Sequence, residues 1–93
     1  MGNVDKTLDG RGNEHGKFES HAAISQRLKG VMHKTIGFMD LPYDMQEALD
    51  MIQHKIARVL NGNPEHIDSW HDIQGYARLV ERRLIKEKED ANS

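Results

Sequence analysis

The stretch that decides the fold is residues 45–60, which read Met45-Gln46-Glu47-Ala48-Leu49-Asp50-Met51-Ile52-Gln53-His54-Lys55-Ile56-Ala57-Arg58-Val59-Leu60. Apolar residues recur in it at steps of three and four, close to the 3.6-residue turn of an α-helix, so they gather on one side. Pro42 precedes the stretch and suits a first helical turn, where its missing N–H has no partner, and Gly62 follows as a left-handed stop. The pattern predicts a helix over residues 42–60.

Two further helices flank this one. Apolar residues at helical spacing from Phe18 to Ile36 predict a helix over residues 18–37. A third apolar stripe, from Trp70 to Leu84, predicts a helix over residues 68–87 with Asp68 as its N-cap. The alternating pattern that is typical of strands does not occur, so the sequence predicts an all-α, three-helix domain whose apolar stripes share one interior.

The two ends of the chain differ from the middle in composition. Residues 1–16 hold four of the eight glycines among charged residues and show no helical period, which predicts a flexible N-terminal arm. Residues 17–87 form the predicted helical domain, and residues 88–93 have nothing apolar to bury and are predicted to fray. A helical part of about seventy residues has a thin core, so we expect a homo-oligomer to complete it.

Composition narrows the class of protein. The chain has no cysteine, which excludes a disulfide framework and a thiolate zinc site and favours a cytoplasmic setting. No run of about twenty apolar residues occurs, so no membrane span is predicted. Thirteen basic residues against fifteen acidic ones, without a basic block, give no strong signal for nucleic-acid binding.

Two pairs of carboxylates are candidates for chemistry. Glu47 and Asp50 are three residues apart on the polar side of the middle helix, at a separation that a hard divalent cation can bridge. Asp68 and Asp72 form a second pair on the third helix. If the two pairs face each other, the four carboxylates converge and hold Mg²⁺ or Mn²⁺ against phosphates. The alternative for the first pair is a solvated face on which Asp50 pairs with His54.

Two features of the third predicted helix, its central glycine and its carboxylate pair, bear on whether a ligand binds there. Gly75 stands in its middle, where glycine costs about 1 kcal/mol relative to alanine, so we expect another helix or a ligand to approach the backbone closely there. The structural alternative for the second carboxylate pair is that Asp68 only caps the helix and that Asp72 forms an ion pair with Lys55 or Arg58.

Several short motifs along the chain are similar to those of a known family. They are Arg11, His15-Gly16-Lys17-Phe18, Ile24-Ser25-Gln26-Arg27-Leu28-Lys29, Glu47-Ala48-Leu49-Asp50-Met51-Ile52, Lys55-Ile56-Ala57-Arg58 and Asp68-Ser69-Trp70-His71-Asp72-Ile73-Gln74-Gly75-Tyr76-Ala77. Over about residues 8–84 this order resembles a family of small phage and prophage proteins of unknown function. The resemblance implies a protein of the bacterial host cytoplasm.

More distantly, the helix that carries Lys55 and Arg58, followed by the acidic helix ending in Gly-Tyr-Ala, is similar to MazG-type nucleotide pyrophosphohydrolases and to phage nucleotide-modification-associated domains. In the MazG type, acidic pairs on two consecutive helices bind Mg²⁺, which activates water to cleave a nucleoside triphosphate to the monophosphate and pyrophosphate. The first hypothesis is therefore a nucleotide-binding or nucleotide-hydrolysing protein. Its metal ligands are Glu47, Asp50, Asp68 and Asp72, and its phosphate contacts are Lys55, Arg58 and Lys17.

The chain departs from the MazG pattern at both acidic pairs. The first pair lacks a doubled glutamate, and the second has a spacing of four residues rather than three. These departures, the small core and the mobile ends motivate a second hypothesis, a non-catalytic phage accessory protein that binds a host factor through its polar helix face and its arm. Whether the chain is an enzyme stays open at this point.

Overall fold

The computed structural model describes residues 16–93, and every regular element in that range is a helix. The elements are α2 (Phe18–His33), α3 (Ile36–Met39), α4 (Tyr43–Asn61) and α5 (Ile67–Ala91). The prediction of an all-α domain with three long helices is confirmed. The predicted arm, residues 1–16, lies outside the described residues except for Gly16. Within residues 16–93, no helix has both the length and the apolar character needed to cross a bilayer.

The first predicted helix, over residues 18–37, is in fact two helices. α2 ends at His33, and the short α3 begins at Ile36. Thr35 separates them because its hydroxyl donates to the carbonyl of Met32 at 2.8 Å and accepts from the N–H of Phe38 at 3.0 Å. One side chain thus closes the end of the first helix and caps the start of the next.

The connection from α4 to α5 also differs from the prediction. Gly62 has φ −133°, so it is not the predicted left-handed stop; its N–H still donates to the carbonyl of Arg58 at 3.0 Å. α5 begins at Ile67 with His66 at the N-cap position, so Asp68 lies in the first turn instead of capping the helix. There the carboxylate of Asp68 still faces the positive end of the helix dipole.

α5 continues to Ala91, past the predicted end at residue 87 and through residues predicted to fray. Glutamate and lysine are strong helix formers even where nothing is buried. An ion pair one turn apart, from Arg83 Nη1 to Glu87 Oε1 at 3.0 Å, supports this part of the helix.

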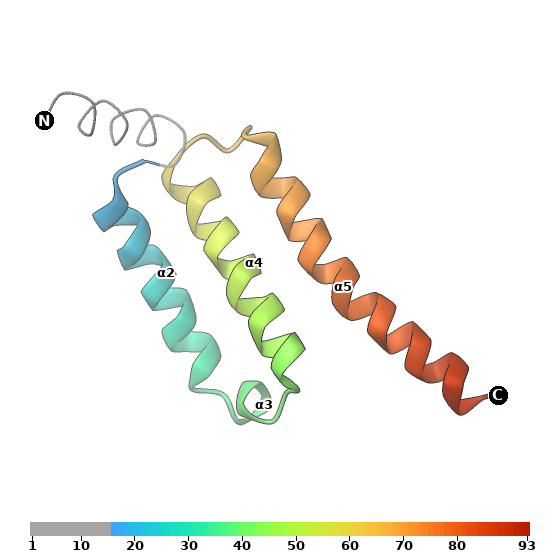
Figure 1. Cartoon of the computed structure of the whole chain (residues 1–93). Coiled ribbons are helices and arrows are strands. Elements are labelled where there is room, and N and C mark those ends of the chain that lie inside the picture. The colour runs from blue at the N-terminus through green and yellow to red at the C-terminus, as the bar shows by residue number, and fades with distance from the viewer. Residues whose placement is uncertain (1–15) are drawn as a thin grey trace, which may run out of the picture.

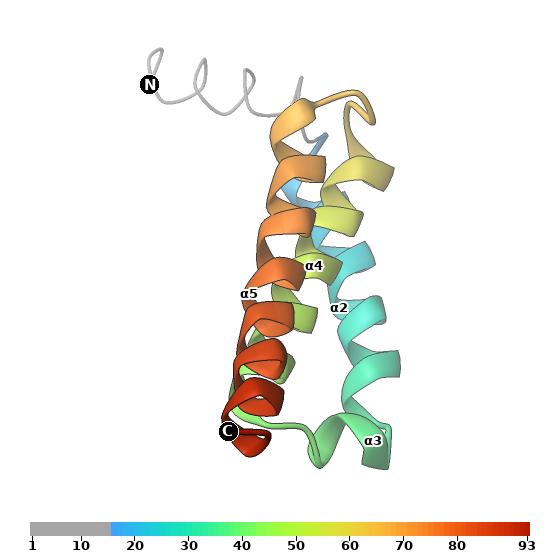
Figure 2. The same ribbon diagram turned by 90° about the vertical axis from the view of Figure 1, so that its right-hand side faces the viewer.

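The three long helices lie side by side with α4 in the middle (Figure 1). α2 and α5 each pack against α4 and run antiparallel to it, and a view turned by 90° looks on the layer from its α5 edge (Figure 2). Four hydrogen-bonded or ion-paired side-chain pairs of the described residues tie the outer helices to the central one. They are Ser25–Gln53 and His33–Asp50 on the α2 side, and Lys55–Asp72 and Asp44–Arg83 on the α5 side.

The predicted apolar interior shared by the three helices is wrong for a single chain. Among the described residues, the buried apolar side chains are Ala48 and Ala57, both small. The buried polar residues in the seams between helices are His21, Ser25, Gln53 and Ser69. Small and polar side chains thus fill the seams, and the larger apolar side chains are exposed or only half-buried.

Candidate functional site

The contacts between helices fix which way each helix faces. On α4, Gln53 and Asp50 point toward α2, and Lys55 points toward α5. Since successive helical residues are rotated by about 100°, the remaining α4 side chains fall on two opposite faces of the layer. One of these, which we term the polar face, carries side chains from all three helices. Its residues are Lys29, Glu47, His54, Arg58, Asp68, Asp72 and Gly75, with Lys55 at its α5 edge.

A cluster of cations surrounds His54 on the polar face. The pKa of His54 is lowered to about 4, first because the ring is partly buried and then because Arg58, His21, Lys55 and Lys29 oppose another positive charge. His54 is therefore uncharged at neutral pH. Lys29, Lys55 and Arg58 make up what we term the cationic cluster, which joins α2 to α4.

Polar atoms without partners lie beside the cationic cluster. The rings of His21 and His54 meet edge-on, and burial, with the charge of Arg58, lowers the pKa of His21. Nδ1 of His21 and Nε2 of Gln53 are buried and have no hydrogen-bond partner among the described residues. Oε1 of Gln53 does accept a hydrogen bond from the Ser25 hydroxyl at 3.1 Å. Such atoms are rare in folded proteins.

The α2 residues of this site were not predicted from the sequence. His21, Ser25 and Lys29 follow one another at four-residue spacing, so all three lie on one side of α2. That polar stripe beside the apolar one was the available signal. Apolar spacing alone does not indicate it, because the spacing marks the apolar side of a helix and not which polar residues are buried.

The predicted metal ligands have different partners. Asp50 Oδ1 lies 2.6 Å from Nε2 of His33 on α2, and not beside His54 as the alternative expected. Asp72 Oδ2 lies 2.9 Å from Nζ of Lys55, and the hydrogen bond from that amine is the main cause of the lowered pKa of Asp72. This is the ion pair that the structural alternative anticipated.

Within one chain, the four carboxylates do not form one group. α4 and α5 run antiparallel, so Glu47, near the start of α4, and Asp68, near the start of α5, lie toward opposite ends of the layer. Asp72 is level with Lys55, which is eight residues or about 12 Å along the helix axis from Glu47. Among residues 16–93, no three His, Asp or Glu side chains are grouped closely enough to hold a metal ion.

Two of the three residues predicted to contact phosphate lie close together in the structure. Lys55 and Arg58 both belong to the cationic cluster, to which the structure adds Lys29. Lys17 lies beside the end of α4, since its carbonyl accepts a hydrogen bond from Nδ2 of Asn61 at 2.9 Å. Its backbone is therefore about one helical turn beyond Arg58, and its side chain is exposed.

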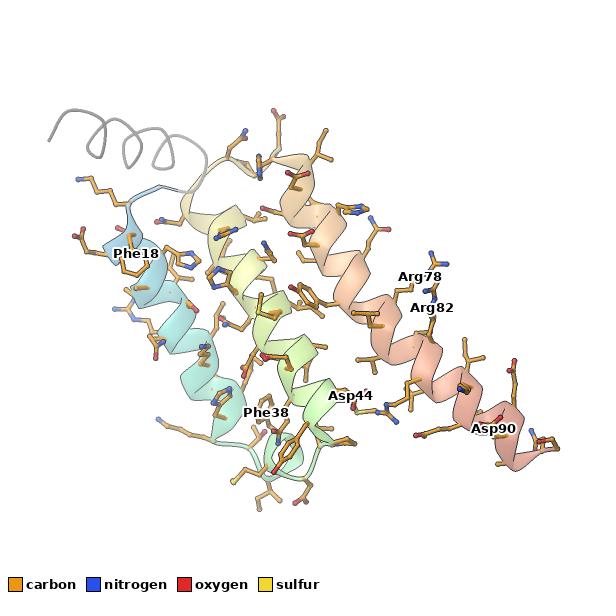
Figure 3. The ribbon with its side chains drawn as sticks, in the orientation of Figure 1. Phe18, Phe38, Asp44, Arg78, Arg82 and Asp90 are labelled. Atoms are coloured by element: carbon orange, nitrogen blue, oxygen red, sulfur yellow. The ribbon has the colours of Figure 1, made fainter. Side chains whose placement is uncertain are left out.

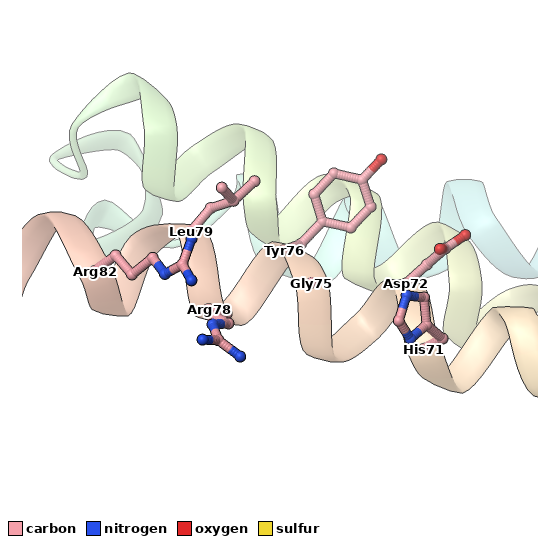
Figure 4. Close-up of a pocket in the computed structure, with 7 residues that line it drawn as sticks. All are labelled: His71, Asp72, Gly75, Tyr76, Arg78, Leu79 and Arg82. Carbon is pink, nitrogen blue, oxygen red and sulfur yellow. The ribbon is translucent and has the colours of Figure 1, made fainter.

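Gly75 opens a hollow on α5 next to the cationic cluster (Figure 4). A Cβ atom at Gly75 would meet nothing within 4 Å, so the close approach expected from another helix does not occur within the chain. Arg78 and Arg82 project from α5 on the side away from α4 (Figure 3). The residues that line the hollow are His71, Asp72, Gly75, Tyr76, Arg78, Leu79 and Arg82.

Comparison with known proteins places this surface inside a family domain. Residues 1–84 match the model of a family described as a domain of unknown function, DUF6378. The chain belongs to this family. No curated protein and no solved structure matches it. The DUF6378 match includes α2, α4 and α5 as far as Leu84, so the cationic cluster and the hollow at Gly75 both belong to the family domain.

Proposed function

We propose that this DUF6378 protein binds a phosphorylated small molecule, a nucleotide, on its polar face. The observation that carries the proposal is that two of the three cations in the cationic cluster have no carboxylate partner among the described residues. Lys29 and Arg58 form no ion pair with another described residue, and the same charges help to keep His54 neutral. A phosphate group would supply the missing negative charge and accept charge-assisted hydrogen bonds from these side chains.

The Lys55–Asp72 ion pair lies where the cationic cluster meets the hollow at Gly75. The side chain of Lys55 is only 12% exposed, so Asp72 holds a largely buried amine in a defined position. A phosphate in the cluster competes with Asp72 for this amine. The adjoining hollow, lined by Tyr76 and open at Gly75, is a place where a base or sugar can lie. The likeness of the Lys55–Arg58 helix to MazG-type proteins supports a nucleotide as the ligand.

Metal-dependent pyrophosphohydrolysis is the more specific form of the proposal. The four carboxylates of one chain do not fit a single ion, but Asp68 and Asp72 are four residues apart on one face of α5. Mg²⁺ is commonly held by one or two carboxylates together with the phosphates of the substrate, which supports these two residues as its ligands, with Mn²⁺ as a substitute. A bound ion would neutralise phosphate charge and supply an activated water. Asp72 would then exchange Lys55 for the ion.

The test is a nucleotide panel scored by thermal shift, with Mg²⁺ and with EDTA. Ligands that bind only the folded state raise Tm. We expect Arg58→Gln to remove the shift, and Arg27→Gln, an exposed change elsewhere on α2, to leave it intact. The absence of any shift with nucleoside mono-, di- and triphosphates would refute the proposal.

Asp72→Asn separates the two forms of the proposal. If phosphate binds the cations directly, this change frees Lys55 and strengthens binding equally in Mg²⁺ and in EDTA. If Asp72 is a metal ligand, the change removes the part of the binding that depends on Mg²⁺. Release of pyrophosphate from a nucleoside triphosphate, measured on the same samples, decides whether the protein is an enzyme.

A second candidate function is a non-catalytic accessory protein that binds a host factor. The partners of two of the four carboxylates favour it, because Asp50 and Asp72 form ion pairs between helices and so hold the fold together within one chain. A pull-down from host lysate tests it, with Arg58→Gln as the polar-face control. Robust nucleotide turnover with no stoichiometric partner would count against this function.

A further inference from the structure

The apolar stripe of α4 is only partly covered within the chain, although α4 is the central helix. Met45, Leu49, Ile52, Ile56 and Val59 follow one another at steps of four, three, four and three residues. This is the spacing of a coiled-coil seam, in which one helix packs lengthwise on another. Leu49 and Ile56 are nevertheless 40% and 39% exposed. The stripe points away from both α2 and α5.

The apolar stripes of the two outer helices point to the same side. α2 and α5 are antiparallel to α4, and Ser25 and Asp72 fix which of their sides face α4. Stepping about 100° per residue from these contacts places the stripes of both helices beside that of α4. We term this surface the apolar face. Its central residues are Leu28 on α2, Leu49, Ile52 and Ile56 on α4, and Ile73 and Val80 on α5.

We propose that the apolar face packs against the same face of a second copy of this chain, with α4 lying on α4. A two-fold axis brings identical surfaces together, so a surface of this kind needs no other protein for its partner. The heptad spacing of α4 is self-complementary, and no charged residue interrupts its stripe. The second copy supplies the interior that a single chain lacks, since only Ala48 and Ala57 are buried apolar residues among those described.

The size of the apolar face matches that of a stable interface. α4 has nineteen residues and is about 28 Å long. Three helices about 8–10 Å apart make the layer about 25 Å wide, so the face presents about 700 Å² in projection. This is close to the roughly 800 Å² that each partner contributes to a standard protein–protein interface.

The charges at the α5 edge of the apolar face favour a second copy over a membrane surface. Glu81 and Glu87 border the apolar hollow at the α5 edge of the face, together with Lys88. Helices that bind anionic membranes carry lysine and arginine at this boundary. A mixed rim with acidic residues instead suits a protein surface that carries charges of both signs.

The mass of the full chain in solution tests the proposal. Light scattering should give twice the 10.7 kDa of one chain. Leu49→Glu/Ile56→Glu places charges in the interface and should weaken association more than about tenfold. Leu79→Glu is the matched control, because Leu79 is 63% exposed but belongs to the hollow on the opposite side of α5. A wild-type monomer, including one that binds lipid vesicles, would overturn the proposal, as would equal effects of both changes.

A second experiment introduces no charge into the apolar face, so it does not depend on whether a charged variant still folds. The chain has no cysteine, so a single introduced cysteine can form a disulfide only with another copy. Ile52 lies at the centre of the α4 stripe, where two-fold related helices meet. Under mild oxidation, Ile52→Cys should give a covalent dimer, and Glu47→Cys, on the polar face of the same helix, should not. If neither variant links, or if both link equally fast, the interface is elsewhere. Neither experiment involves a nucleotide, so this inference and the proposed function can fail separately.

Discussion

The imidazole of His54 meets that of His21 edge-on, with ring centroids 4.6 Å apart and ring planes at 78°. This contact joins α4 to α2 beside three cationic side chains. Two neutral rings can hold this position, whereas two imidazolium ions would repel each other and Arg58. The pair therefore links the protonation state of the polar face to the stability of the fold.

Acidification should destabilise the protein through His54. Its pKa is about 4 in the folded chain and about 6.5 when unfolded, so between these values the unfolded chain binds more protons. Stability is then lost as pH falls from 6.5 toward 4. We expect Tm to drop by several degrees between pH 7 and pH 5, and to drop less in His54→Gln. His71→Gln, at an exposed histidine, is the control, and an equal loss of Tm in both variants would contradict the assignment.

The buried Ser25–Gln53 pair should make the fold less stable than an apolar pair at the same two positions would. Gln53→Ala alone leaves a cavity and an unpartnered Ser25 hydroxyl, so we expect a loss of about 1–3 kcal/mol. Ser25→Ala/Gln53→Leu removes both polar groups, including the unpartnered Nε2 of Gln53, and should be neutral or more stable by about 1 kcal/mol. Urea denaturation measures both. A double variant less stable than Gln53→Ala would show that the polar pair stabilises the fold.

Changing Gly75 or Gly30 to alanine should have the same effect on stability but different effects on nucleotide binding. Both are helical, and a Cβ atom would meet nothing within 4 Å at either, so each change to alanine should raise the free energy of unfolding by about 0.5–1 kcal/mol. If the hollow at Gly75 receives part of the nucleotide, only Gly75→Ala should reduce the nucleotide-induced thermal shift. Equal shifts in the two variants would exclude the hollow from the site.

Gly16→Ala should destabilise the contact between the start of α2 and the end of α4. Gly16 has φ +75°, a conformation that residues with a side chain rarely adopt, and an added Cβ would overlap the carbonyl oxygen of Asn61. We expect a loss of about 1–3 kcal/mol by urea denaturation. Gly30→Ala is the matched control, because a Cβ atom at Gly30 would meet nothing within 4 Å. A Gly16→Ala protein as stable as wild type would mean that this contact does not form.

Much of the fold was predictable because its signals are local. The 3.6-residue period over 45–60 predicted α4 to within a residue or two, and the all-α class followed from the absence of alternation. The division between α2 and α3 was not predicted, since it depends on both hydrogen bonds of the Thr35 hydroxyl. The length of α5 was underestimated because its last turns need no burial.

The candidate site was predictable only in part. Lys55, Arg58 and Asp72 were singled out from the sequence, and the Lys55–Asp72 ion pair was one of the two interpretations offered. His21 and Lys29 were not, because they join the site from a helix more than twenty residues away in the chain. Whether Glu47 lies near Asp68 depends on the direction and register of packing between α4 and α5. Helical periodicity does not predict either property.

The sequence by itself determined that three amphipathic helices form and which side of each is apolar, because both properties depend on neighbours within two turns. The tertiary structure decided that small and polar residues fill the seams between helices, that the three apolar sides share one open face, and that a cationic cluster occupies the other. The physical reason is that side-chain size and hydrogen bonding across a seam select how helices dock, and these act between residues far apart in the chain.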